Sequence, residues 1–253
     1  MLRRLSTSCI PLNLLNRYYA SKESVSVENS PRTEPRLHRK LYHLTLREEK
    51  EEKLRDFLPA NPLLPSGWSL RHEPGSNRFD LKKEVEIRNC GAEVLHIIAL
   101  MEVKQYEHTF RMDNGEREEQ EYLNFTLFLK KKRYPKGGLE FGLTSIDMEL
   151  VLDSLAIHDS DESIENAITA FDLDPTTRSS PGGTNLFKRR KRDSRYRGPM
   201  ISELDDDLSD EILDYLDERG VNNPFAEYMM SQAHYFEQEE YLNWLHLLRR
   251  FAD

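Results

Sequence analysis

The side chains that most often perform catalysis or bind metals do not combine into a site in this sequence. Cys9 and Cys90 are the only cysteines, too few for a disulfide framework or a cysteine zinc site. His38 and His43 lie five residues apart, so they do not share a helix face as an i, i+4 metal pair would. No glycine-rich phosphate loop and no Gly-x-Ser-x-Gly elbow occurs. The sequence predicts a protein that is not an enzyme, with no metal site and no cofactor.

Charge is the property that is unevenly distributed. From Met200 to the C-terminus there are fourteen acidic residues and three arginines. An acidic surface of this kind repels nucleic acid and attracts basic proteins. The Asp run at 205–207 suits the start of a helix better than a weak cation site, because the helix dipole favours acids there. The predicted partner-binding residues are Asp205, Asp206, Asp207, Asp210, Glu211 and Asp214.

A second segment carries the opposite charge. Residues 186–197 contain seven basic residues and one acidic residue. Such a run could contact the phosphates of RNA, each contact adding salt-dependent affinity. It could equally be a solvated loop, or fold onto the acidic surface of its own chain. The candidate nucleic-acid-binding residues are Lys188, Arg189, Arg190, Lys191, Arg192, Arg195 and Arg197.

The N-terminal residues have the composition of a targeting signal. Residues 1–20 contain three arginines and several hydroxyl residues, and no acid occurs before Glu23. This composition is typical of a mitochondrial targeting peptide. Residues 21–35 are predicted to be a flexible leader and residues 36–253 the folded domain. The longest apolar runs are far shorter than the roughly 18 residues of a membrane span, so no membrane span is expected.

The hydrophobic pattern along the domain changes from helix to strand and back to helix. Leucines from Leu37 to Leu58 predict an amphipathic helix whose EEKEEK run is exposed. Alternation then predicts strands over 79–87, 94–103 and 123–129. Changes of parity predict a turn or bulge near Thr144–Ser145 and another at Asp153–Ser154. Short turns make the sheet an antiparallel meander, and residues 159–200, which lack apolar periodicity, are predicted to be a long mobile loop.

Two helix patterns close the chain. Ser209 is the predicted cap of a helix that stops at Gly220. Asn223 is the predicted cap of the next helix, followed by Pro224. This segment is one long helix, or two with a break near 237–240, and its apolar face must pack on the sheet or on a neighbouring subunit. The residues of this face are Phe225, Met229, Phe236, Tyr241, Leu245, Leu248 and Phe251.

Several motifs of the C-terminal third resemble one known family. They are Tyr196-Arg197-Gly198-Pro199, the run Glu203 to Leu208, Tyr215 to Val221, and Glu240 to Leu245. In this order they resemble the mitochondrial acidic matrix protein family, also called the mitochondrial glycoprotein family. It is the family of the mammalian protein that binds complement globular heads and hyaluronan. The resemblance implies an α+β fold: a seven-stranded twisted antiparallel sheet flanked by one N-terminal and two C-terminal helices, in a doughnut-shaped homotrimer.

The resemblance and the charge pattern together predict a function. We expect a non-enzymatic, trimeric acidic adaptor or chaperone of the mitochondrial matrix. It would support mitochondrial gene expression, and so respiration, by binding basic RNA-binding or ribosomal proteins. The basic run at 188–192 departs from the family's usual loop, so direct RNA binding through residues 188–197 is the alternative. Whether the trimer is homomeric or mixed with a paralogue is left open.

Overall fold

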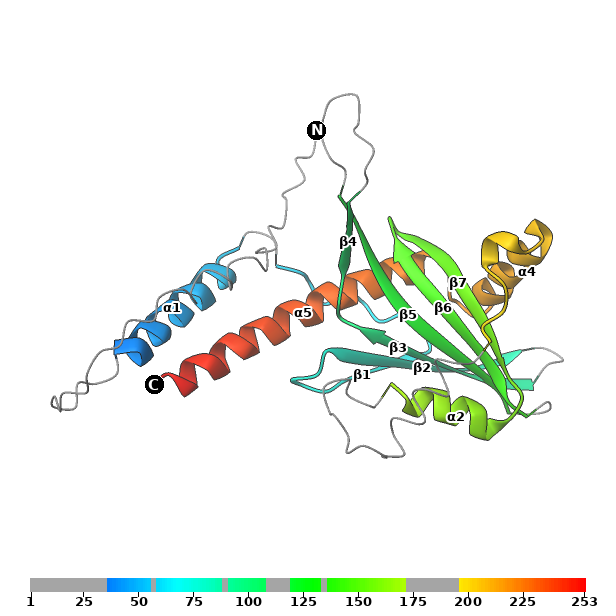
Figure 1. The fold of residues 1–253 in the computed structure, drawn as a ribbon, viewed down its shortest axis with the longest axis horizontal. Helices are drawn as coiled ribbons and strands as arrows, with labels where there is room; N and C mark the ends of the chain where they lie inside the picture. Colours follow the sequence, from blue (N-terminus) through cyan, green and yellow to red (C-terminus); the bar gives the residue numbers. More distant parts are fainter. Residues whose placement is uncertain (1–35, 56–57, 88–90, 108–118, 133–135, 172–195) are drawn as a thin grey trace, which may run out of the picture.

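The computed structural model describes residues 36–55, 58–87, 91–107, 119–132, 136–171 and 196–253. Within these ranges the chain forms one antiparallel sheet and several helices (Figure 1). The strands are β1 (Trp68–His72), β2 (Arg78–Ile87), β3 (Gly91–Leu100), β4 (Lys104–Glu107), β5 (Glu119–Lys131), β6 (Gly138–Ile146) and β7 (Glu149–His158). The helices are α1 (Arg36–Lys53), α2 (Asp161–Thr169), the 3₁₀ turn η2 (Ile201–Glu203), α4 (Asp206–Asp217) and α5 (Asn223–Phe251).

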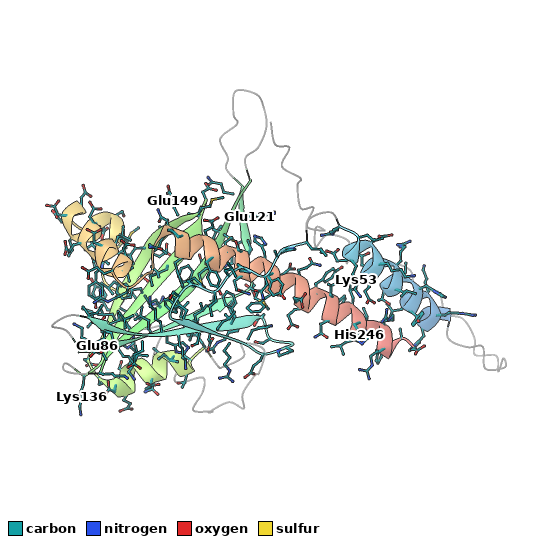
Figure 2. All side chains as sticks on the ribbon, turned by 180° about the vertical axis from the view of Figure 1, so that it is seen from behind. Lys53, Glu86, Glu121, Lys136, Glu149 and His246 are labelled. Atoms are coloured by element: carbon teal, nitrogen blue, oxygen red, sulfur yellow. The ribbon has the colours of Figure 1, made fainter. Side chains whose placement is uncertain are left out.

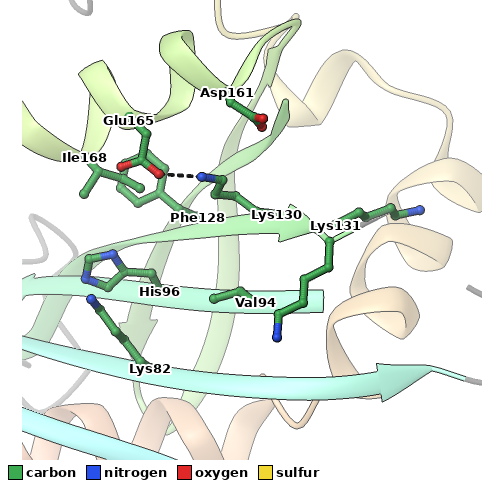
Figure 3. Close-up of a pocket in the computed structure, with 10 residues that line it drawn as sticks. Lys82, Val94, His96, Phe128, Lys130, Lys131, Asp161, Glu165 and Ile168 are labelled. Carbon is green, nitrogen blue, oxygen red and sulfur yellow. Dashed lines mark hydrogen bonds and ion pairs between the residues drawn. The ribbon is translucent and has the colours of Figure 1, made fainter. Parts of the chain in front are cut away.

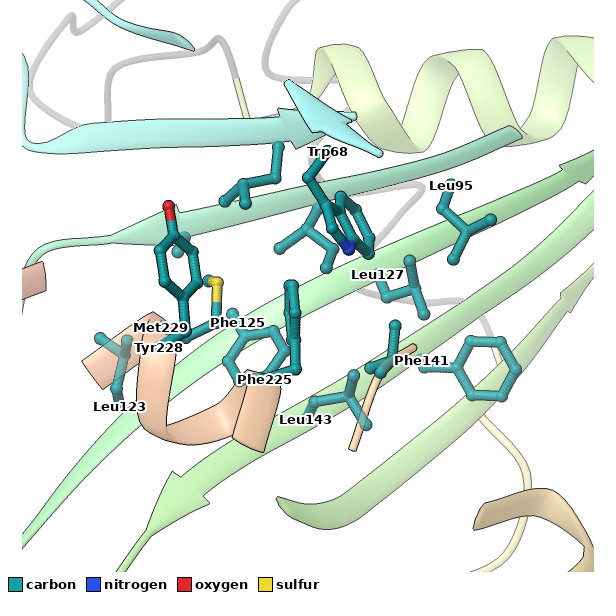
Figure 4. Packing of buried hydrophobic residues seen from close by; sticks show 14 of the residues in the cluster. Trp68, Leu95, Leu123, Phe125, Leu127, Phe141, Leu143, Phe225, Tyr228 and Met229 are labelled. Atoms are coloured by element: carbon teal, nitrogen blue, oxygen red, sulfur yellow. The ribbon is translucent and has the colours of Figure 1, made fainter. Parts of the chain in front are cut away.

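The sheet is antiparallel, as the hydrophobic pattern predicts, and has the seven strands that the family resemblance implies. Its order is β1-β2-β3-β5-β6-β7, and β4 pairs with β5 beside this path. Because side chains alternate between faces, the odd-numbered residues Leu95, Ile97 and Leu127 all point to one face and are fully buried there. The first half of α5 crosses this face, and Phe225 packs on Trp68 with ring centroids 4.8 Å apart (Figure 4). The main core therefore lies between α5 and the sheet.

The turn between β6 and β7 lies two to three residues beyond the predicted place. Asp147 and Met148 form it with φ of 50° and 67°, which is the backbone of a two-residue hairpin turn. The prediction failed because Ser145 is polar but buried, its hydroxyl donating to the carbonyl of Ala226 at 2.8 Å. The second predicted irregularity is confirmed, since Gly142 pairs with Ser154 while Leu143 pairs with Leu152. Asp153 is the extra residue of that bulge.

The prediction that residues 159–200 form one long loop is wrong for its first third. Ser160 caps α2, its side chain accepting a hydrogen bond from the N–H of Ser163. Ile164 and Ala167 are buried against Ile98 and Phe128, on the sheet face opposite α5. A helix of nine residues shows too few turns for its period to stand out in sequence. Residues 172–195 of the predicted loop lie outside the described residues.

Helix α1 differs from the prediction in its end and in its exposed face. It ends at Lys53, and Leu54 beyond it is 79% exposed. Glu49 and Glu52 of the EEKEEK run are buried rather than exposed. They lie against α5, where Arg249 reaches Glu49, so ion pairing lets carboxylates occupy the packed face.

The C-terminal helices begin at other residues than predicted, and the choice between one helix and two is resolved. Helix α4 begins at Asp206, three residues before Ser209. The cap of α5 is Asn222 rather than Asn223, because the Asn222 side chain accepts from the N–H of Phe225 at 3.1 Å. Helix α5 then continues unbroken for 29 residues. Its second half leaves the sheet and pairs with α1 as an arm (Figure 1).

Candidate partner-binding surfaces

Helix α4 presents the predicted acidic residues to solvent. Asp207, Asp210, Glu211 and Asp214 recur at three- and four-residue spacing, so they share one face of the helix. All six predicted acidic residues are exposed, and Figure 2 shows that α4 lies at one end of the molecule, with some of its side chains extending outward. Among the residues that the structure describes, none of the six forms an ion pair. We call Asp205, Asp206, Asp207, Asp210, Glu211 and Asp214 the acidic face.

The opposite side of α4 holds the helix on the sheet. Leu216 and Val221 are fully buried. Gly220 adopts a φ of 76°, which lets the chain turn back so that the Val221 N–H donates to the Leu216 carbonyl at 3.0 Å. These residues belong to the family-like run Tyr215 to Val221. That motif therefore serves the fold, and it orients the acidic face outward.

A buried ion pair strengthens this attachment. The Arg219 Nε donates to Glu93 of β3 at 2.7 Å, and the two side chains are 2% and 0% exposed. The Arg219 guanidinium also stacks on the Tyr215 ring at 3.3 Å from its centroid and donates to the Tyr215 carbonyl at 2.6 Å. Lys83 donates to the Arg219 carbonyl at 2.9 Å, and burial lowers the pKa of Lys83. The end of α4 is thus bound to the centre of the sheet by charge-assisted hydrogen bonds.

The carboxylates of the acidic face have opposite effects on the stability of α4. Asp205, Asp206 and Asp207 lie at its N-terminus, where the helix dipole favours acids. Asp207 and Glu211, and likewise Asp210 and Asp214, are like-charge i, i+4 pairs, each destabilising by about 0.2–0.5 kcal/mol. Asp214 lies close to the negative end of the helix dipole, where an acid is unfavourable. No basic residue occurs in the last turn of α4. Helix stability therefore accounts for the acids at 205–207 but not for the continuation of the cluster to Asp214.

The predicted basic segment is described only at its end. Lys188, Arg189, Arg190, Lys191, Arg192 and Arg195 lie outside the described residues. Arg197 is described, with its Nη2 3.8 Å from Glu140 Oε1 and its side chain 41% exposed. Glu140 is a buried residue of β6 that also bonds His158 at 3.1 Å. One predicted phosphate-binding side chain thus lies over a buried carboxylate of its own chain.

The apolar face predicted for the last helix is covered mainly by its own chain. Phe225 and Met229 are buried in the main core, and Phe236 packs against it. Further along, Leu245 is buried, and the Tyr241 hydroxyl donates to Glu48 of α1 at 3.3 Å. Leu248 is half-buried and Phe251 is 76% exposed. Only the end of this face is left uncovered within the described chain.

The arm of α1 and α5 exposes other apolar residues that the sequence reading did not select. Trp244 is 56% exposed and Leu247 is 51% exposed. With Phe251 they are spaced three and four residues apart, so they share one side of α5. Leu44 of α1 adds to the exposed apolar surface at 41%. The periodic pattern of 244, 247 and 251 was a signal that could have identified this surface.

Sequence reasoning also missed two buried polar clusters. Glu93 binds Arg219 across 126 residues of sequence. The signal in the sequence was that Glu93 is an acidic residue within an otherwise apolar strand, which indicates a buried partner. His158 lies between Glu140 and Ser163, 3.0 Å from the Ser163 hydroxyl. This row of Ser, His and Glu joins β6, β7 and α2. His158 is only 2% exposed, so the row is placed to hold α2 on the sheet.

Two features are absent from the part of the chain that the structure describes. No group of three or more His, Cys, Asp or Glu side chains there is arranged to hold a metal ion. None of the described helices combines the length and the apolar character needed to span a bilayer.

Comparisons with known proteins agree with the fold. Over 102 residues the chain is 34% identical to the mitochondrial acidic protein mam33 of Schizosaccharomyces pombe, an alignment covering 40% of this chain and 36% of that protein. The crystal structure of Trypanosoma brucei p22 matches with a TM-score of 0.65 at 21% identity, covering 87% of this chain and 100% of that one. A Leishmania major protein of unknown function, described as a homologue of human p32, matches with a TM-score of 0.63 at 24% identity, covering 86% and 99%.

The family itself is established by sequence. The model of the mitochondrial glycoprotein family matches residues 42–252, which is nearly the whole of the domain. The two solved structures support the same fold. The chain belongs to the mitochondrial glycoprotein family.

Proposed function

We propose that this protein is a non-enzymatic acidic adaptor of the mitochondrial matrix that binds basic proteins. Its partners would be RNA-binding or ribosomal proteins, so that it supports mitochondrial gene expression and, through it, respiration. The proposal is in keeping with the name of the Schizosaccharomyces pombe relative, a mitochondrial acidic protein.

The acidic face of α4 is the observation that carries the proposal. Its carboxylates are exposed and have no ion-pair partner in the described chain. The i, i+4 repulsions that involve Asp210, Glu211 and Asp214, and the position of Asp214 near the helix C-terminus, lower the stability of α4. Charges that are retained at such a position serve solubility or binding, and their alignment on one rigid helix favours binding. Arg219 and Glu93 fix that helix on the sheet, so the negative potential has a defined place on the surface.

The acidic face can be tested with a basic probe of defined composition. The probe is a fluorescein-labelled arginine-rich peptide, and binding is followed by fluorescence anisotropy. The test variant neutralises four acids of α4 through Asp207→Asn, Asp210→Asn, Glu211→Gln and Asp214→Asn. The control variant changes the net charge equally at exposed acids elsewhere, through Glu86→Gln, Glu149→Gln, Glu162→Gln and Glu239→Gln.

The two variants give opposite expectations. Neutralising α4 should weaken binding about tenfold, because several exposed ion pairs of about 0.2–1 kcal/mol each are lost together. The control should bind within about twofold of the unmodified chain, since it alters only the long-range field. Equal weakening by both variants would show that net charge alone attracts the probe, and the acidic face would then not be the docking site.

We also propose that the adaptor is a trimer, homomeric or mixed with a paralogue. The exposed side of α5 with Trp244, Leu247 and Phe251 supports this, because such an apolar patch on a protruding arm marks a contact with another chain. Sedimentation of the full chain should give three subunits. Replacing these three residues by Ser should give single subunits, whereas Ile157→Ser, at a 69% exposed residue of β7, should leave the assembly intact. A single subunit for the unmodified chain would contradict the proposal.

A further inference from the structure

On the sheet face opposite α5, a groove of about 440 Å³ lies between α2 and strands β2, β3 and β5 (Figure 3). We propose that this groove binds a small organic phosphate of nucleotide size. Its volume lies within the range of small-molecule sites, about 300–1,000 Å³. The site is distinct from the acidic face and independent of the adaptor function.

The groove gathers lysines although the chain as a whole is acidic. Lys82, Lys130, Lys131 and Lys132 line it together with His96, whereas the net charge of the chain is −9. The carboxylates among the lining residues are Asp161 and Glu165. Carboxylates pair with three of these lysines, so Lys82 supplies the charge that is left for an anion, and a concave site focuses its field.

The lysines differ in how strongly they are held. Lys130 pairs with Glu165, and Lys132 pairs with Glu84. Lys131 is 3.9 Å from Glu93, whose main partner is Arg219. Lys82 is exposed and has no ion pair within the described residues. Its ammonium group is therefore the one most available to an incoming phosphate.

Lys82 lies beside an oriented histidine. It is the cross-strand neighbour of His96, and Figure 3 shows both side chains at the same end of the groove. His96 Nε2 is 3.3 Å from Asp80, and Arg78 Nε donates to the same carboxylate at 2.6 Å. An imidazole held by a carboxylate through one nitrogen can offer the other to a ligand.

The floor of the groove is apolar. Val94 of β3 and Ile168 of α2 line it above Phe128, which is fully buried. Inorganic phosphate would use only the cationic rim of such a site, and an uncharged apolar molecule would use only the floor. A molecule that joins an apolar or aromatic group to a phosphate uses both. This combination of rim and floor selects an organic phosphate over the simpler anions.

ADP is a suitable probe, titrated by calorimetry into the full chain at low salt. Lys82→Glu should weaken binding at least about tenfold, because it removes a charge-assisted hydrogen bond and places a like charge beside the phosphate. The matched control is Lys136→Glu, an exposed lysine that does not line the groove (Figure 2), and it should change affinity less than about twofold. Methyl NMR should show shifts at Val94 and Ile168 on ADP addition and none at Ile157.

Three further ligands distinguish this proposal from its alternatives. Adenosine without phosphate should bind much more weakly than ADP, and pyrophosphate should bind without shifting the Ile168 methyl. An oligoribonucleotide that binds through Lys82 while ADP does not would overturn the proposal in favour of a nucleic-acid surface. Absence of ADP binding, or equal weakening by Lys82→Glu and Lys136→Glu, would overturn it as well.

Discussion

Removing Arg219 should expose how strongly α4 depends on one buried ion pair. In Arg219→Ala the Glu93 carboxylate, 0% exposed, loses its hydrogen-bonded partner at 2.7 Å. Breaking a buried pair in this way costs about 3–5 kcal/mol. Lys131, at 3.9 Å from Glu93, can partly replace the lost charge, so we expect the lower end, about 3 kcal/mol. The double variant Glu93→Gln with Arg219→Ala should recover part of this loss, because no charge then remains buried.

Equilibrium unfolding in guanidinium chloride at neutral pH and fixed protein concentration measures this effect. Arg219→Lys provides the conservative comparison: it keeps the charge but loses the stacking on Tyr215, and we expect an intermediate cost of about 2 kcal/mol. A loss below about 1 kcal/mol for Arg219→Ala would refute the reasoning. It would mean that Glu93 is satisfied without Arg219.

Three further outcomes follow from particular contacts. Burial favours protonation of Asp80, but hydrogen bonds from His96 and Arg78 hold the pKa of its carboxyl at about 2. The stabilisation that these bonds give the folded state is complete above the unfolded pKa of about 4 and is lost as the pH falls toward 2. Asp80→Asn should therefore cost about 2 kcal/mol at pH 7, and about half of that at pH 3, by denaturant unfolding. Gly137→Ala should lower the melting temperature strongly, because its Cβ would lie 2.1 Å from the His158 carbonyl oxygen. Gly75→Ala should lower it less, because its Cβ meets no atom and only the strain of a φ of 82° remains; equal effects would contradict the geometry. Asp214→Asn should raise stability by about 0.3–1 kcal/mol, and any measured loss would mean that the carboxylate has a partner in the folded chain.

The strands were predictable because their burial follows the period of two. Leu123, Phe125, Leu127 and Leu129 alternate without exception and are all buried. The β6–β7 turn was misplaced where one polar residue, Ser145, occupies an inward position through a bond to α5. Such a bond joins residues 81 apart in sequence, and local patterns carry no information on it.

The helices show a different limit of sequence reasoning. Exposure of the acidic face was predictable, because unpaired carboxylates are rarely buried. The burial of Glu49 and Glu52 was not, because it depends on the pairing of α1 with α5 and on the ion pairs with Arg249 and Arg55. The apolar pattern of α5 identified a packed face but could not distinguish its own sheet from a second chain. The groove under α2 could not be predicted for the same reason, since its lysines come from two segments that lie far apart in the sequence.

The dependence of partner binding on ionic strength tests the central claim most directly. Binding of the arginine-rich peptide to the full chain should be measured by anisotropy from low to high salt. If the acidic face acts by electrostatic attraction, affinity should fall steadily as the Debye length shrinks from about 10 Å at 0.1 M to about 3 Å at 1 M, and the α4 variant should show a shallower fall. An affinity that is unchanged across this range would contradict the account.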